Sequence, residues 1–294
     1  MLQSLGEAVA GNVRDGDTVF VGGFGQCIPF AIGHELIRQK RRDLVLCRSG
    51  ADILFDLLIA AGCVRKVVIG YLGNPGIGLA HAFRRAVEAG TLEVEDWTNF
   101  AMVLRLHAGA LGVPYLPTAT LNGGDIPTAL GIETVLCPYT GERLSAVPAL
   151  RPDVAILHVH AADEAGNLQL DGLPGDTVEG ALASRRIIAT AEKILSADET
   201  RRNPKRTIVP GFMVHAVAHV PMGAHPSYVA GVYGRDDEAY ADWDKLSRDA
   251  ERLDEWIARE ILGVSDFAGY LDHIGATRLA ALVAAEQPSG EPGR

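Results

Sequence analysis

The stretch Asp17-Thr-Val-Phe-Val-Gly-Gly-Phe-Gly-Gln-Cys-Ile-Pro29 decides how this chain folds. Residues 18–21 form an apolar run, glycines follow at Gly22, Gly23 and Gly25, and an apolar-periodic segment begins behind the proline. This order predicts a strand, a glycine loop and the start of a helix. Because a glycine has no Cβ, the N–H groups of such a loop can approach a ligand and hold a phosphate or a developing oxyanion.

Two common nucleotide-binding motifs do not fit this loop. Counted from Gly23, the third glycine of a G-x-G-x-x-G motif falls on Ile28, and no clear ribose-binding acid follows at the expected distance. A Walker loop is absent as well, because the chain contains no Gly-Lys-Ser or Gly-Lys-Thr. On the glycines alone, a tight strand-to-helix turn without a ligand is the alternative interpretation.

Strands and helices alternate outward from this loop. We predict strands at residues 18–21, 43–47, 65–71 and 92–95, and helices at 2–13, 29–40, 52–61, 79–88 and 99–111. For the helix at 29–40 the proline is expected at the first helical position. Repeated strand–helix units indicate an α/β fold with an open, mostly parallel sheet and helices on both faces.

The second half of the chain is less regular. Residues 114–152 are rich in Gly, Pro and Thr, with one short strand expected near 133–136, and a loop of this length is usually functional or faces a partner. Further strands are expected at 154–160, 187–190 and 207–209, followed by a charged, helical carboxyl end at 237–286. We therefore expect one α/β domain over residues 1–286 and a polar, frayed tail at 287–294.

Composition narrows the class of protein. The 294 residues are 48% hydrophobic, which is enough to bury a large core, and no run is apolar enough to suggest a membrane span or a signal peptide. A cytoplasmic protein is expected. The net charge of −10 argues against nucleic acid as a partner. The four cysteines are scattered without a C-x-x-C pair, so neither a metal cage nor a disulfide framework is expected.

Ligands of an open parallel sheet bind at the carboxyl ends of its strands. The segments expected there are 22–25, 49–50, 71–76, 97–99 and 121–127, which supply main-chain donors and small polar groups. The chain has no G-x-S-x-G elbow, no H-E-x-x-H and no cysteine with an evident histidine partner. His158 with His160, and His215 with His219 and His225, have spacings that would suit a metal, but core or interface positions are the favoured interpretation.

Several short motifs carry a family resemblance. They are Asp15-Gly16 with the Val-Phe-Val-Gly-Gly-Phe run, Ser49-Gly-Ala-Asp52, Gly78-Leu-Ala80 running into Phe83-Arg-Arg-Ala-Val-Glu88, Ala162-Asp-Glu-Ala-Gly-Asn167 and Val220-Pro-Met-Gly-Ala-His-Pro226. Together they resemble the A (α) subunit of family I coenzyme A transferases, especially the glutaconate CoA-transferase type. The chain departs from the family signature in one place: a glycine expected between Gly-Gly-Phe and Pro29 is missing, and the spacing is one residue short.

The resemblance implies a reaction in which a glutamate attacks an acyl-CoA thioester. Coenzyme A would then take part as the acyl-CoA substrate, together with a carboxylic acid and without a metal. In this family the glutamate belongs to the β subunit, in a Ser-Glu-Asn-Gly or similar motif, and no Glu-Asn-Gly occurs here. We therefore expect no catalytic residue in this chain, a β subunit of similar size as its partner, and no activity without that partner.

On this view, three groups of residues are expected to build the site. They are Gly22, Gly23, Phe24 and Gly25 for the oxyanion or acyl group, Ser49, Gly50 and Asn99 for the substrate carboxylate, and Gly123, Gly124 and Asp125 as a turn at the pocket or the subunit seam. Each has a simpler alternative: Ser49 and Asn99 could cap helices, and the Gly-Gly pair could only form a turn.

Two other functions remain open from the sequence. Some relatives of these subunits resemble hydrolases that open a ring of a CoA-linked steroid fragment, using a glutamate near the segment that corresponds to 97–100. Asn99 stands at that position here, but Glu95 and Asp96 are close by. The other possibility is a non-catalytic α/β subunit that binds a ligand without turnover.

Overall fold

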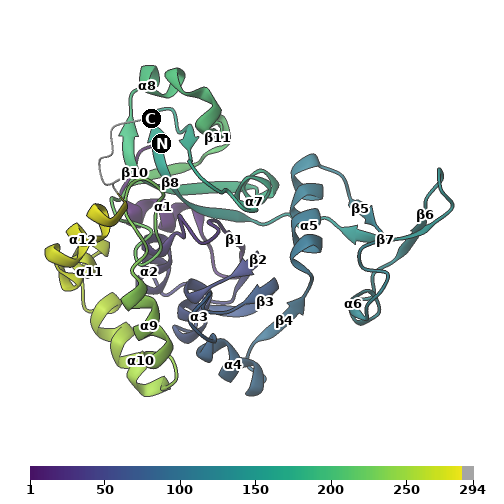
Figure 1. Ribbon diagram of the computed structural model, residues 1–294, viewed down its shortest axis with the longest axis horizontal. Helices are drawn as coiled ribbons and strands as arrows, with labels where there is room; N and C mark the ends of the chain where they lie inside the picture. The colour runs from purple at the N-terminus through teal and green to yellow at the C-terminus, as the bar shows by residue number, and fades with distance from the viewer. Residues whose placement is uncertain (287–294) are drawn as a thin grey trace, which may run out of the picture.

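The computed structural model describes residues 1–286, so the predicted polar tail at 287–294 lies outside the described residues (Figure 1). Seven parallel strands form the centre of the fold. In spatial order they are β12 (Ala216–His219), β10 (Arg186–Leu195), β8 (Val154–Asp163), β1 (Thr18–Val21), β2 (Leu44–Ala51), β3 (Val64–Leu72) and β4 (Glu93–Asp96). Two short antiparallel strands, β9 (Leu168–Gln169) and β11 (Thr207–Val209), continue the sheet beside the far end of β8.

Helices cover both faces of this sheet, which confirms the predicted fold class. Val19 and Val21 of β1 belong to one apolar cluster, whereas Phe20 between them belongs to another. Since successive side chains of a strand point to opposite faces, a strand buried on both sides must be apolar throughout. The run Val-Phe-Val meets that requirement.

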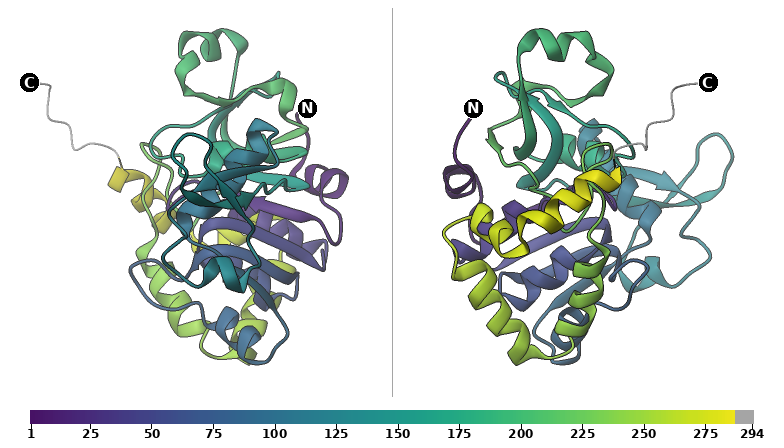
Figure 2. Two further views of the ribbon diagram at one scale, coloured as in Figure 1. Left: turned by 90° about the vertical axis from the view of Figure 1, so that its right-hand side faces the viewer. Right: turned by 60° about the vertical axis from the view of Figure 1, so that its left-hand side comes forward.

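The two layers differ in their helices (Figures 1 and 2). The first layer contains α1 (Leu5–Asn12), α2 (Phe30–Arg38), α3 (Ile53–Ala60), α4 (His81–Glu88), α9 (Asp237–Leu246), α10 (Ala250–Ile257) and α11 (Phe267–Ile274). The second contains α5 (Asn99–Leu111) and α7 (Thr177–Ala183), which pack against each other and against the sheet. The carboxyl-terminal helices therefore return to the layer formed by the first strands and helices of the chain.

The remaining segments are short. They comprise α6 (Ile126–Ala129), α8 (Ala197–Arg202), single turns at Pro204–Arg206 and Gly211–Met213, a π-type turn at Ala258–Leu262 that continues α10, and α12 (Ala276–Glu286). The charged carboxyl end is helical as predicted, but it is divided into several helices. Pro29 differs from prediction, because it stands at the N-cap of α2 and not at its first helical position.

Residues 115–148 form a separate antiparallel sheet that extends beyond α5 in Figure 1. Its strands are β5 (Tyr115–Thr118), β7 (Arg143–Pro148) and β6 (Thr134–Leu136), in that spatial order. The short strand near 133–136 is confirmed as β6, whereas β5 and β7 were not predicted. Pro117 explains why β5 was missed: a proline argues against a central strand, but β5 is an edge strand, where the missing N–H is tolerated.

No helix within residues 1–286 combines the length and the apolar character that crossing a bilayer would require.

Close packing between α7 and the sheet gives a test of this fold. A Cβ added at Gly180 would lie 2.2 Å from the ring of Phe20, which is fully buried. We expect Gly180→Ala to lower the free energy of unfolding by about 1 to 3 kcal/mol through overpacking, although alanine favours helices. Urea denaturation measures this change.

Gly11→Ala is the matched control. Gly11 lies in α1 and is exposed, and a Cβ added there would meet nothing within 4 Å. The same substitution at this position should raise stability by about 0.5 to 1 kcal/mol. Equal effects at the two positions would contradict the packing of α7 on β1.

Candidate functional site

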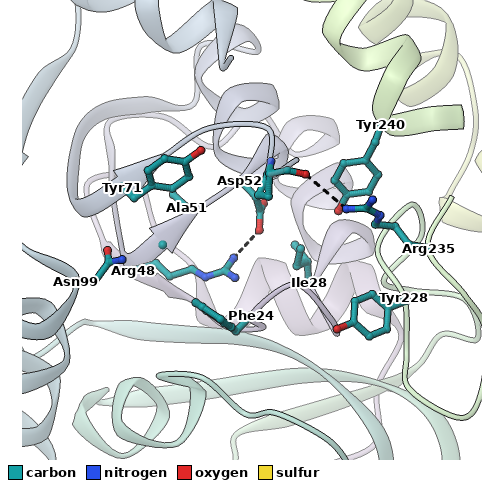
Figure 3. Close-up of a pocket in the computed structure, with 13 residues that line it drawn as sticks. Phe24, Ile28, Arg48, Ala51, Asp52, Tyr71, Asn99, Tyr228, Arg235 and Tyr240 are labelled. Atoms are coloured by element: carbon teal, nitrogen blue, oxygen red, sulfur yellow. Dashed lines mark hydrogen bonds and ion pairs between the residues drawn. The ribbon is translucent and has the colours of Figure 1, made fainter. Parts of the chain in front are cut away.

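A cavity of about 350 Å³ opens at the carboxyl ends of the first strands (Figure 3). Its lining comes from the loop after β1, the ends of β2 and β3, the first residue of α5, and the segment between β12 and α9 with the start of α9. The lining residues are Phe24, Gly25, Ile28, Arg48, Gly50, Ala51, Asp52, Tyr71, Pro75, Asn99, Tyr228, Arg235 and Tyr240. The position agrees with the expectation that a parallel sheet binds its ligand at this edge.

A buried ion pair forms the polar centre of the cavity. Arg48 is 1% exposed, and its Nη1 lies 2.7 Å from Oδ2 of Asp52. The other oxygen of Asp52 accepts from the N–H of Leu54 at 3.1 Å and so caps α3. The Nε–H of Arg48 is buried and has no acceptor among the described residues. A buried donor without a partner is unfavourable, so a ligand acceptor in the cavity would stabilise it.

Arg48 was not among the residues predicted for the site. A signal was present, because Arg48 is the one charged residue in the apolar run of β2 and is followed four positions later by an aspartate. A charge on a doubly covered strand must be paired or face a cavity.

The glycine loop offers fewer free donors than its sequence suggests. The N–H groups of Gly22, Gly23 and Phe24 already have acceptors within the chain. These acceptors are Ile156 O at 2.9 Å, Thr177 Oγ1 at 3.0 Å and Gln26 O at 3.1 Å, respectively. The N–H of Gly25 has no acceptor among the described residues, and Gly25 lines the cavity with φ at 74°. Of the four predicted loop residues, Gly25 is thus the one whose amide remains available to a ligand.

Gly50 and Asn99 line the cavity, but Ser49 does not. The neighbours of Ser49 on β2 face the cavity, and alternation turns its side chain to the opposite face. There its N–H donates to Oδ2 of Asp176 at 2.8 Å. Substrate binding by Ser49, Gly50 and Asn99 stays a prediction.

The structure also shows which residues cap the helices α3 and α5. The alternatives in which Ser49 or Asn99 caps a helix are wrong, because Asp52 caps α3 and Thr98 caps α5.

The predicted turn at Gly123, Gly124 and Asp125 lies elsewhere. These three residues directly precede α6 in the separate sheet region and do not line the cavity. The N–H of Gly124 donates to Leu121 O at 3.3 Å, so the segment does form a turn. A role at a subunit seam stays a prediction.

Aromatic side chains form much of the cavity wall. Phe24 belongs to the predicted glycine loop and Tyr71 to the predicted strand-end segment 71–76, whereas Tyr228 and Tyr240 were not predicted from the sequence. Phe24 and Tyr71 come from the strand ends, and Tyr228 and Tyr240 come from the far end of the chain. Burial raises the pKa of Tyr240, so its hydroxyl remains protonated. The guanidinium of Arg235 lies 5.1 Å from the centroid of the Tyr240 ring. The wall is therefore aromatic with a cation at its rim. Tyr228, Arg235 and Tyr240 were missed because they lie far along the chain from the glycine loop, where no local sequence pattern points to them.

Glu95 and Asp96, which kept ring-opening hydrolysis open, do not line the cavity. Glu95 accepts from Arg105 at 2.6 Å and from the indole of Trp97 at 2.8 Å, and lies 2.9 Å from the Lys66 ammonium. Burial opposes its ionisation, but these hydrogen bonds and charges outweigh burial and lower its pKa to about 2. A carboxylate held this firmly in the ionised form is a poor general acid or base near neutral pH.

The histidines considered as metal ligands have other partners. His158 lies 2.7 Å from Glu192, His219 contacts Glu192 O at 3.1 Å, and His225 lies 2.9 Å from Asp236. Within residues 1–286 no three His, Cys, Asp or Glu side chains are grouped so that they could hold a metal ion.

The Glu95 cluster predicts a pH dependence of stability. Its folded-state pKa lies below the ordinary value of 4.5, so Glu95 stabilises the fold above about pH 4.5, and this contribution is lost as the pH falls toward 2. We expect Glu95→Gln to lower the free energy of unfolding by about 1 to 2 kcal/mol at pH 7. In urea denaturation between pH 7 and pH 3, the difference from wild type should shrink with falling pH.

Glu93→Gln provides the control, because Glu93 contacts the same lysine but its side chain is 60% exposed. It should change stability by less than about 0.5 kcal/mol. A Glu95→Gln effect that stays constant with pH would show that charge is not what Glu95 contributes.

Comparisons with known proteins agree with this geometry. The family model described as coenzyme A transferase matches residues 2–219. The A subunit of 3-oxoadipate CoA-transferase from Pseudomonas knackmussii is 42% identical over 92% of this chain and 96% of its own. The crystal structure of glutaconate coenzyme A-transferase from Acidaminococcus fermentans superposes with a TM-score of 0.90 at 32% identity, covering 96% of this chain and 95% of the other.

A relative that is named for a different activity is less similar to this chain. The cholesterol ring-cleaving hydrolase IpdA subunit from Rhodococcus jostii is 28% identical over 90% of this chain and 92% of its own. The hydrolase alternative is therefore not favoured.

Proposed function

This chain belongs to the coenzyme A transferase family as an A-type enzyme subunit, and from that premise we propose that it acts with a β subunit to move CoA between an acyl-CoA and a carboxylic acid. The observation that carries the proposal is that the carboxylate in the cavity is already bonded within this chain. Among the lining residues within 1–286, Asp52 alone bears a carboxylate, and it is committed to Arg48 and to the α3 cap. In the proposal, the nucleophilic carboxylate therefore belongs to the partner.

In the proposed reaction, an oxygen of the partner's glutamate attacks the thioester carbonyl, and the CoA thiolate leaves to give an acyl-glutamyl anhydride. The thiolate then attacks the glutamyl carbonyl, which releases the acid and leaves a glutamyl-CoA thioester. The second acid reverses these steps. Each attack places negative charge on a carbonyl oxygen, and the Gly25 N–H is the donor that this chain offers to it.

The lining of the cavity also favours one class of acyl group. Its walls are mainly aromatic and aliphatic, and its charged lining residues are Arg48, Asp52 and Arg235, which leave one net positive charge. The free Nε–H of Arg48 adds a buried donor. An apolar chain that ends in a second carboxylate satisfies all three features. The relatives named for 3-oxoadipate and glutaconate carry the names of dicarboxylic acids.

Purification with the native partner tests the function. The chain is isolated from its host with any bound subunit, and CoA transfer is measured with panels of dicarboxylic and monocarboxylic acyl donors. We expect a partner of similar size, transfer between two acids with ping-pong kinetics, and no activity of either chain alone. Turnover of a CoA thioester by the lone chain would place the nucleophile in this subunit and refute the proposal.

Within that assay, Arg48 should be required for dicarboxylic substrates. Removing its charge would leave Asp52 unpaired and buried, so the informative variant is Arg48→Gln combined with Asp52→Asn. We expect kcat/KM for dicarboxylic acyl-CoA to fall about tenfold or more, because a charge-assisted hydrogen bond is lost. Arg201→Gln, an exposed arginine on α8, is the control and should not change it.

The other two interpretations give different outcomes in the same assay. Carbon–carbon bond hydrolysis without an acceptor acid would indicate the ring-opening activity, which the ion-paired state of Glu95 disfavours. Binding without turnover in the presence of the correct partner would indicate a non-catalytic subunit.

A further inference from the structure

The family match and the cavity do not have the same extent along the chain. The part matched by the family model, here called the matched part, ends at residue 219, yet Tyr228, Arg235 and Tyr240 line the cavity. In Figure 3 these three side chains lie on the opposite side of the cavity from Tyr71 and Asn99. One wall is therefore built by the matched part, and the other by residues 220–246, which we call the cap.

The cap is joined directly to the glycine loop. The N–H of Cys27 donates to Tyr228 O at 2.9 Å, and the Ser227 hydroxyl donates to Gly25 O at 2.8 Å. Farther along, the N–H of Ala31 donates to Gly223 O at 2.9 Å. Because these hydrogen bonds fix both segments, the cap holds a defined position over the loop that offers the free Gly25 amide.

The outer side of the cap is anchored by a buried network. His225 is fully buried, with Nε2 2.9 Å from Asp236 Oδ2 and Nδ1 3.0 Å from the Tyr270 hydroxyl. Arg278 binds the other oxygen of Asp236 at 2.6 Å. Burial disfavours the charged form of Asp236, but the bonds from His225 and Arg278 outweigh it and hold its pKa below the ordinary value. The residue next to Arg235 is thus fixed to the carboxyl-terminal helices.

The cap also contacts the strand-end loop on the far side of the cavity. The Asn74 amide donates to Tyr240 O at 3.0 Å, and Asn74 is 1% exposed. The Arg235 guanidinium donates to Pro75 O at 3.5 Å, and its Nε lies 2.5 Å from Asp237. Arg235 is therefore held at the rim, where its charge faces both the cavity and solvent.

We propose that the cap is the specificity element of the site, in which Arg235 selects an acyl group with a negatively charged far end. This inference rests on the proposed function and adds to it, because it assigns selectivity to residues 220–246, which lie beyond the residues that the family model matches. The matched part supplies Arg48 and the Gly25 amide. The cap supplies the wall that closes the cavity and one of its two cations.

The test uses the complete complex and two series of acyl-CoA donors of matched length, with and without a terminal carboxylate. Arg235→Gln should lower kcat/KM about tenfold for the carboxylated series and less than about twofold for the uncharged series. Arg201→Gln is the matched control on exposed α8.

An equal loss in both series with Arg235→Gln, or no loss in either, would overturn the proposal. Circular dichroism and thermal unfolding verify that each variant is folded. If the wild-type complex transfers no CoA at all, the proposed function fails. Calorimetric binding of free dicarboxylic and monocarboxylic acids to the same variants then still decides whether the cap selects the charged end.

Discussion

Strand β8 is the constraint on which the sheet depends. All ten of its residues are buried, and it pairs in parallel with β1 along one edge and with β10 along the other. A strand in this position can expose no main-chain group and no unpaired side chain. His158 meets this requirement, because its ring nitrogens contact Thr190 and Glu192 of β10 at 2.8 and 2.7 Å. Because the seven central strands are all parallel to β8, their carboxyl ends lie at the same edge of the sheet.

That common edge explains why the cavity lies where it does. Gly25, Arg48 and Tyr71 are far apart in sequence, but each follows or ends a parallel strand, so the sheet brings them to one place. The Arg48–Asp52 ion pair then forms the buried charged group of the cavity. A buried pair must be well satisfied to be tolerated, and here one donor is left over in a space lined mainly by apolar groups. The cavity thus combines a buried hydrogen-bond donor with a mainly apolar wall.

Local sequence patterns predicted much of the fold but only part of the site. Alternating strands and helices, the glycine loop and the strand ends at Gly50, Tyr71 and Asn99 follow from periodicity and from the geometry of parallel sheets. Ser49 shows the limit of this reasoning, since a shift of one residue reverses the face to which a side chain points. The occupied amides of the glycine loop, and the wall formed by Tyr228 and Tyr240, depend on contacts across the whole chain. No local pattern encodes such contacts.

The hydrogen bond between Cys27 and Tyr228 has a consequence for biosynthesis. The two walls of the cavity are separated by some two hundred residues, so a chain emerging from the ribosome makes the glycine loop long before the segment that covers it. At translation rates of about 5 to 20 residues per second, Tyr240 follows Phe24 by about 10 to 40 s. During that interval the glycine loop lacks the wall that covers it, so the cavity is completed only when residues 220–246 have been made.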